Sequence, residues 1–176
     1  MATSNGAPKW LNPREMKAWR SYIVASRRLL DALDTDLIGH DLTMPDYEVL
    51  AQLSDAPDRR MRMSELAETA MISKSRLSHR MKVMESAGWV RRELCKEDRR
   101  GSWAIMTDKG WKAIVAAAPC HVASVRERFV DHLTTKDQED LAKIFDRLLS
   151  QLRGQYIEES ATPAQKSDAK RTKKAH

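Results

Sequence analysis

Five side chains between Ser75 and Lys82 have the types and the spacing that a DNA-reading helix needs. At about 100° per residue, Ser75, His79 and Lys82 lie on one face of a helix, and Arg76 and Ser78 flank that face. The face combines short hydroxyl donors with cations and contains no carboxylate. Such side chains donate hydrogen bonds to phosphate oxygens and to base edges in a major groove. An ordinary exposed face mixes both charge signs, so this one indicates contact with nucleic acid.

A second basic feature follows in the segment EDRRGSW, residues 97–103. It lies between two stretches, residues 89–94 and 103–107, that alternate like strands, with Val90 and Leu94 on one face. The pattern predicts a β-hairpin with a charged tip. A short charge run is also typical of an ordinary solvated turn. The neighbouring elements are needed to distinguish a nucleic-acid-binding tip from such a turn.

The positive charge of the chain is concentrated in the same region. The 176 residues carry a formal charge of +6, and residues 59–100 hold twelve Lys or Arg against six Asp or Glu. The rest of the chain is therefore neutral. A basic segment within a balanced chain indicates a polyanionic partner, most often nucleic acid, although a solvated basic face has the same composition.

Composition disfavours several other classes of protein. A hydrophobic content of 41% is enough for a folded core, and no apolar run reaches the roughly 20 residues that cross a bilayer. The beginning of the chain lacks the order of a secretory signal, so we expect a cytoplasmic protein without membrane contact. Cys95 and Cys120 have no CxxC or CxxH spacing and the five histidines do not cluster, so we expect no disulfide, metal or cofactor. A cysteine-dependent enzyme is disfavoured because Cys120 and His121 are helix neighbours that project about 100° apart.

The elements that would position the basic side chains are mainly helical. Apolar residues recur in steps of three and four from Pro13 to about Ile38, which predicts one long amphipathic helix. Pro45 suits the first turn of a second helix, and Asp46 is favourable near its positive end. The loop at residues 54–58 ends this second helix.

Two shorter helices lead to the hairpin. Residues 61–63 are compatible with a short strand, and Ser64 is expected to cap a helix that reaches residue 71. Ser73 is expected to cap the next helix, residues 74–87, and Gly88 to end it in a left-handed conformation. The predicted core face of this helix consists of Leu77, Met81 and Met84.

Two amphipathic helices are predicted after the hairpin. Thr107 is expected to cap a long helix that contains Pro119, and Thr135 and Gln138 have capping-box spacing before a final helix. Residues 158–176 lack large apolar side chains and end in a basic run, which predicts a disordered tail.

Helix, short turn, polar-faced helix and cationic hairpin follow one another in the order of a winged helix-turn-helix. Residues 64–110, SELAETAMISKSRLSHRMKVMESAGWVRRELCKEDRRGSWAIMTDKG, closely resemble the MarR family of bacterial transcriptional regulators. The most specific parts are Asp98-Arg99-Arg100-Gly101 and Thr107-Asp108-Lys109-Gly110, and a looser resemblance covers about residues 10–157. His79 is a departure, because the family more often has arginine there.

The resemblance implies a fold that is mainly α with a small β hairpin (α+β), in which residues 42–110 form the winged helix-turn-helix domain. It implies a homodimer held by residues 10–38 and 111–157, although these helices could also pack only within one chain. It also implies a wing that enters the minor groove, where Asp98 orients Arg100. The predicted DNA contacts are Arg62, Ser73, Lys74, Ser75, Arg76, Ser78, His79, Lys82, Asp98, Arg99 and Arg100.

The implied function is that of a homodimeric repressor that binds a pseudo-palindromic operator on double-stranded DNA and is released by a small aromatic or phenolic anion. Members of the family typically hold such a ligand between the dimer helices and the winged domain, and aromatic side chains with polar groups suit it. The candidate ligand residues, each of which is also compatible with an ordinary core, are Trp10, Trp19, Tyr22, His40, Trp111 and His121.

Two alternatives to this function stay open. Redox sensing through Cys95 or Cys120 is the weaker one, because peroxide-sensing relatives use a cysteine near the N-terminus that this chain lacks. A nucleoid-type protein would have the same charge distribution but only a shallow sequence preference and no ligand response.

Overall fold

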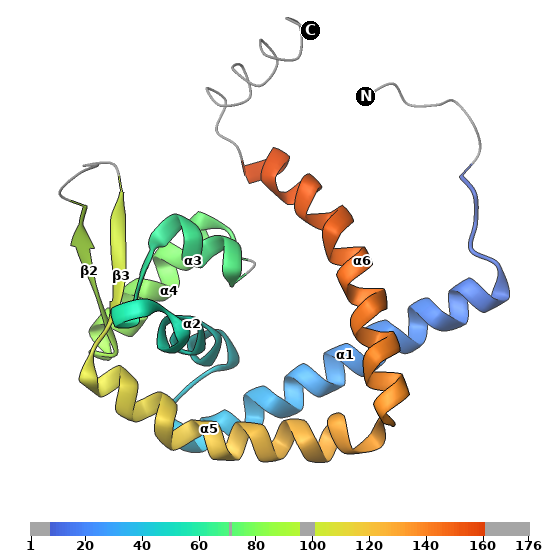
Figure 1. Ribbon diagram of the computed structural model, residues 1–176, viewed down its shortest axis with the longest axis horizontal. Helices are drawn as coiled ribbons and strands as arrows, with labels where there is room; N and C mark the ends of the chain where they lie inside the picture. Colours follow the sequence, from blue (N-terminus) through green and yellow to red (C-terminus); the bar gives the residue numbers. More distant parts are fainter. Residues whose placement is uncertain (1–7, 71, 96–100, 161–176) are drawn as a thin grey trace, which may run out of the picture.

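The computed structural model describes residues 8–70, 72–95 and 101–160, and these are mainly helical (Figure 1). The predicted mainly helical fold with a small hairpin is confirmed. In chain order the elements are α1 (Pro13–Leu37), η1 (Ile38–His40), α2 (Met44–Asp55), η2 (Pro57–Arg59), β1 (Arg60–Arg62), α3 (Met63–Thr69), α4 (Lys74–Ser86), β2 (Val90–Leu94), β3 (Ser102–Met106), α5 (Asp108–Arg128), η3 (Val130–His132) and α6 (Thr135–Ser160).

The hairpin is part of a three-stranded antiparallel sheet with the order β1-β3-β2. The register places Trp103 of the central strand between Arg62 and Glu93. Leu94 was predicted to share the apolar face of Val90, but it is 78% exposed whereas Val90 is buried. The reason is that Leu94 pairs with Ser102 at the outer end of the ladder, away from the core.

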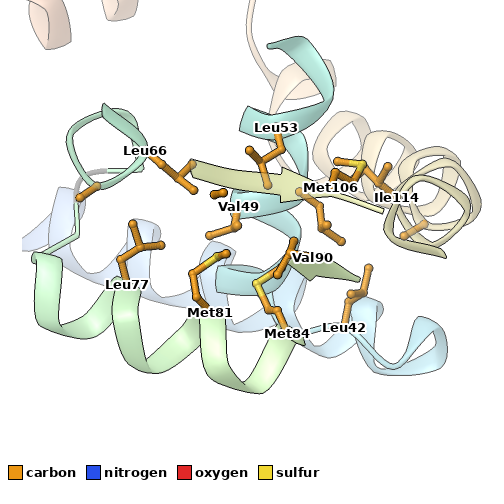
Figure 2. Close-up of a cluster of buried hydrophobic side chains, with 14 of the residues drawn as sticks. Leu42, Val49, Leu53, Leu66, Leu77, Met81, Met84, Val90, Met106 and Ile114 are labelled. Carbon is orange, nitrogen blue, oxygen red and sulfur yellow. The ribbon is translucent and has the colours of Figure 1, made fainter. Parts of the chain in front are cut away.

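The core lies between the sheet and helices α2, α3, α4 and α5. Figure 2 shows Leu77, Met81 and Met84 of α4 pointing toward apolar side chains of α2 and of the strands. All three have no exposed surface, so the predicted core face of α4 is confirmed. Ser73 caps α4 by accepting a hydrogen bond from the amide of Arg76 at 3.3 Å. Gly88, which follows the helix, has a φ of +78°, the left-handed conformation that the sequence predicted.

Helices α1 and α5 lie side by side, and α6 crosses α1 (Figure 1). A polar contact fastens the first two helices together. The hydroxyl of Ser124, which is buried, donates to a carboxylate oxygen of Asp36 at 2.5 Å, and Arg128 forms an ion pair with the same carboxylate. The hydrogen bond from Ser124 is the largest cause that lowers the pKa of Asp36, and Arg128 adds to it. The end of α1 is thereby fixed to α5.

Two predicted helix starts are wrong, the first by two residues and the second by one. Helix α3 begins at Met63, with Arg62 rather than Ser64 at its N-cap, because Arg62 still pairs with Trp103 and the chain turns directly from strand into helix. At α6 the reciprocal cap is made by Thr134 and Asp137 instead of Thr135 and Gln138.

Three other predicted boundaries differ from the structure or fall outside it. Helix α3 ends at Thr69, and residue 71 is outside the described residues. Helix α6 extends to Ser160, so residues 158–160 are helical and do not belong to a tail. The rest of the predicted tail, residues 161–176, is outside the described residues.

A close backbone approach explains Gly110 at the start of α5. A Cβ atom at this position would lie 2.2 Å from the carbonyl oxygen of Trp89, whereas a Cβ at Gly39 would meet no atom within 4 Å. We expect Gly110→Ala to lower the free energy of unfolding by about 1 to 3 kcal/mol, because the backbone must move. The control Gly39→Ala should change it by less than about 0.5 kcal/mol. Chemical denaturation measures both, and equal stability of the two variants would contradict the close approach.

Candidate nucleic-acid interface

The predicted reading face of α4 lies on the surface of the protein. Because the opposite face is fully buried, Ser75, Arg76, His79 and Lys82 are directed outward and exposed, and Ser78 is half-buried at the edge of the face. These side chains come from one helix that is longer than three turns, so their relative positions are fixed by the helix geometry. The arrangement matches a helix that enters a major groove.

The other predicted contacts lie around the beginning of α4 and on the wing. Ser73 is engaged as the N-cap and its hydroxyl lies 3.1 Å from that of Ser75, while Lys74 is exposed in the first turn. The amide groups of a helix N-terminus favour a phosphate, so both residues suit backbone contact. Arg62 lies half-buried in β1. The predicted wing contacts Asp98, Arg99 and Arg100 are outside the described residues.

An ion pair that the sequence did not predict ties α4 to α2. One guanidinium nitrogen of Arg80 lies 3.3 Å from a carboxylate oxygen of Asp46 and 3.3 Å from the hydroxyl of Thr43. Asp46 is only 3% exposed, and its second carboxylate oxygen accepts hydrogen bonds from the amide and the hydroxyl of Thr43. Asp46, which the sequence placed near the positive end of α2, therefore also holds α4 in place.

A second ion pair ties the other end of α4 to the wing. Glu85 accepts hydrogen bonds at 3.0 Å from both the backbone amide and the Nε of Arg92, and a terminal guanidinium nitrogen lies 2.6 Å from its other oxygen. The hydrogen bond from Arg92 is the main reason that the pKa of Glu85 is lowered from its ordinary value of 4.5. The carboxylate thus fixes strand β2 against the last turn of the recognition helix.

Comparison with known proteins agrees with this geometry. Residues 40–101 match the model of the MarR family. The Escherichia coli transcriptional regulator HosA is 32% identical over 110 residues, which are 62% of this chain and 79% of HosA. The crystal structure of AbsC, a MarR family transcriptional regulator from Streptomyces coelicolor, is 46% identical with a TM-score of 0.81, over 84% of this chain and 99% of AbsC.

The chain belongs to the MarR family of DNA-binding transcriptional regulators. Another solved member, Sco3205 from Streptomyces coelicolor, was crystallised in complex with DNA. It is 42% identical to this MarR-family chain with a TM-score of 0.81, over 82% of this chain and 92% of Sco3205.

In this MarR-family chain the six candidate ligand residues do not form one cluster. Trp10 precedes α1 and is 83% exposed, and His40 ends η1. The rings of Trp19 and Tyr22 lie near one another on α1, with centres 6.2 Å apart. Two further contacts involve α5, where Trp111 lies against Arg59 and the ring of His121 lies 4.2 Å from that of Tyr47.

His121 has the most unusual environment of the six. Its Nδ1 atom is buried and has no hydrogen-bond partner among the described residues. Burial lowers the pKa of this histidine from its ordinary value of 6.5, so the ring is neutral at pH 7. The ring therefore has an unused polar atom at the contact between α5 and α2.

No helix within residues 8–70, 72–95 and 101–160 is long and apolar enough to cross a membrane. The same ranges contain no group of three or more His, Cys, Asp or Glu side chains that could hold a metal ion.

We expect Glu85→Gln to lower the free energy of unfolding at pH 7 by about 1 to 2 kcal/mol, because it weakens a half-buried, charge-assisted bidentate contact. The control Glu93→Gln removes the exposed pair with Arg91 and should cost less than about 0.5 kcal/mol. Folding lowers the pKa of Glu85, so its carboxylate stabilises the folded protein at pH values above 4.5, the ordinary pKa of the group in the unfolded chain. This stabilisation is lost as the pH falls through the pKa that Glu85 has in the folded protein. Urea denaturation from pH 7 to pH 3 measures this, and a difference from the parent that does not shrink as the pH falls below 4.5 would contradict the assignment.

Proposed function

We propose that this protein is a homodimeric transcriptional repressor that binds a pseudo-palindromic operator through α4 and the wing. The observation that carries the proposal is the division of α4 into a fully buried face and an exposed face of hydroxyls and cations without a carboxylate. Sco3205, a relative at 42% identity, was solved in complex with DNA. A two-fold symmetric dimer presents two such helices, which match a symmetric pair of half-sites.

The proposed dimer is supported by apolar side chains left exposed on three helices. Isolated exposed apolar residues are common, but a long series on α1, α5 and α6 is typical of an interface between subunits. The rings of Tyr22 and Phe145 lie 5.8 Å apart and join α1 to α6, so residues of both helices belong to one region. The exposed apolar residues of the three helices are Trp19, Tyr22, Val24, Leu30, Trp111, Val115, Val122, Ile144, Leu148, Leu149 and Leu152.

The proposed effector is a small aromatic or phenolic anion, and His121 is the candidate residue best placed to bind it. A neutral imidazole offers one donor and one acceptor, and the buried Nδ1 is available for a ligand hydroxyl. Tyr47, 4.2 Å away, provides an aromatic surface on α2. Because Asp46, the residue before Tyr47, pairs with Arg80, a ligand that displaces α2 would act directly on the recognition helix.

Two substitutions on α4 test the reading face. His79→Ala should cost about 1 to 3 kcal/mol of operator affinity and relax the preference at one base pair, because it removes a contact with a base edge. Lys82→Ala should weaken operator and scrambled DNA alike and reduce the salt slope, because it removes a phosphate contact. The control Lys143→Ala removes one charge from α6 and should change neither the operator affinity nor the salt slope. Fluorescence anisotropy with DNA from the region upstream of the gene, in a salt series, measures all three.

Equal binding of operator and scrambled DNA by the parent would instead support a nucleoid-type protein. Binding by His79→Ala and Lys82→Ala that equals the parent at every salt concentration would exclude α4 as the reading helix.

One substitution on α6 tests the dimer. Leu148→Glu should raise the dimer dissociation constant by about two orders of magnitude, because an unpaired carboxylate would be buried in the interface. The neighbouring residue Arg147 is exposed and provides the control Arg147→Glu, which adds an acidic side chain outside the apolar series. Sedimentation velocity over a concentration series measures both constants. A Leu148→Glu dimer as tight as the parent would place the interface elsewhere.

A further inference from the structure

Two arginines of β1 lie against a single tryptophan of β3. The guanidinium carbons of Arg60 and Arg62 lie 4.0 Å and 4.7 Å from the centre of the Trp103 ring. Arg62 is directly opposite Trp103 in the ladder, and Arg60 is opposite Ile105. As alternate residues of one strand, both arginines project from the same face of the sheet. We call these three residues the arginine-tryptophan stack.

The stack brings two positive charges onto one ring. Two guanidinium groups that approach one ring repel each other, and the cation–π attraction of each to the indole offsets part of that repulsion. Within the described residues, neither Arg60 nor Arg62 forms an ion pair with a carboxylate, in contrast to Arg59, Arg80 and Arg92. An anion beside the stack would relieve the repulsion.

The position of the stack on the wing indicates which anion. Trp103 lies two residues after Gly101, about 7 Å along the strand from the beginning of the tip. The minor groove of DNA is about 7.5 Å deep and about 6 Å wide, with phosphates along both rims. The base of a wing whose tip lies in the groove is directed at these phosphates.

The Arg60 end of the stack is unsuitable for DNA. A pocket of about 540 Å³ at that end is lined by Arg60, Met61 and Trp103 together with the acidic side chains of Asp55, Asp58 and Glu65, whereas Arg62 does not line it. These carboxylates repel phosphate. The DNA backbone therefore passes on the side of Arg62, which is nearer the tip.

We propose that the stack is a phosphate-binding surface beside the wing, in which Arg62 contacts the DNA backbone and Trp103 is the positioning residue that holds its guanidinium. This inference rests on the proposed function, in which the protein binds DNA through α4 and the wing, and on the expected entry of the wing into a minor groove. Arg60 stacks on the same indole and adds to the positive potential at the rim. The surface contributes affinity without reading sequence, because it touches only the backbone.

The test is a salt titration of operator and scrambled DNA with the full-length dimer, followed by fluorescence anisotropy. Arg62→Gln should reduce the slope of log affinity against log salt by about one per protomer, equally on both DNAs. The matched control is Arg59→Gln, which removes the same charge from the preceding segment. Arg59 stacks on Trp111 with its guanidinium carbon 4.2 Å from the ring centre and pairs with Asp108, so the slope should not change.

Trp103 is tested by two variants that keep every charge. Trp103→Leu should reduce the slope as Arg62→Gln does, and Trp103→Phe should largely restore it, because an aromatic ring is present again. Thermal unfolding of each variant separates this role from a purely structural one. A Trp103→Leu protein with a lower melting temperature but the parental slope, or an Arg62→Gln protein with the parental slope, would overturn the inference. A parent that binds neither DNA would overturn the proposed function itself, and the inference with it.

Discussion

The burial of one face of α4 is the constraint on which the rest of the structure depends. Leu77, Met81 and Met84 have no exposed surface and pack against α2 and the sheet (Figure 2). Truncating one such side chain typically costs about 2 to 5 kcal/mol, a large part of the stability of a domain. The helix therefore cannot rotate about its axis without losing its core. Its opposite face, which contains His79 and Lys82, has a fixed direction toward solvent.

Charged contacts then fix the helix along its length. Arg80 joins its middle to α2 through Asp46, and Glu85 joins its last turn to strand β2 through Arg92. Each pair has one partner on a neighbouring element of the winged domain, so the recognition helix and the wing move together. The contacts continue outward, because Tyr47 of α2 lies against His121 of α5, and α5 is joined to α1. A series of contacts thus links α4 to the long helices through α2 and α5.

The sequence predicts the structural features that depend on local periodicity. It does not predict the features that depend on contacts between distant segments of the chain. The buried and exposed faces of α4 follow from the 3.6-residue period of a helix. The glycine after α4 follows from the left-handed conformation in which helices commonly end. The predicted caps at Ser64 and Thr135 are wrong by two residues and by one residue, because the preceding strand or turn determines where a helix begins. Arg80 and Asp46 are 34 residues apart, and no local pattern indicates that they meet. The arginine-tryptophan stack likewise requires the register of β1 against β3.

The central claim is that two fixed recognition helices, one from each protomer, read two half-sites of one operator. Hydroxyl-radical footprinting of the full-length protein on the DNA upstream of its gene tests this most directly. The account predicts two protected half-sites related by a dyad, with centres about 10 base pairs apart on one face of the DNA. Protection of a single isolated half-site, or continuous protection without a dyad, would contradict it.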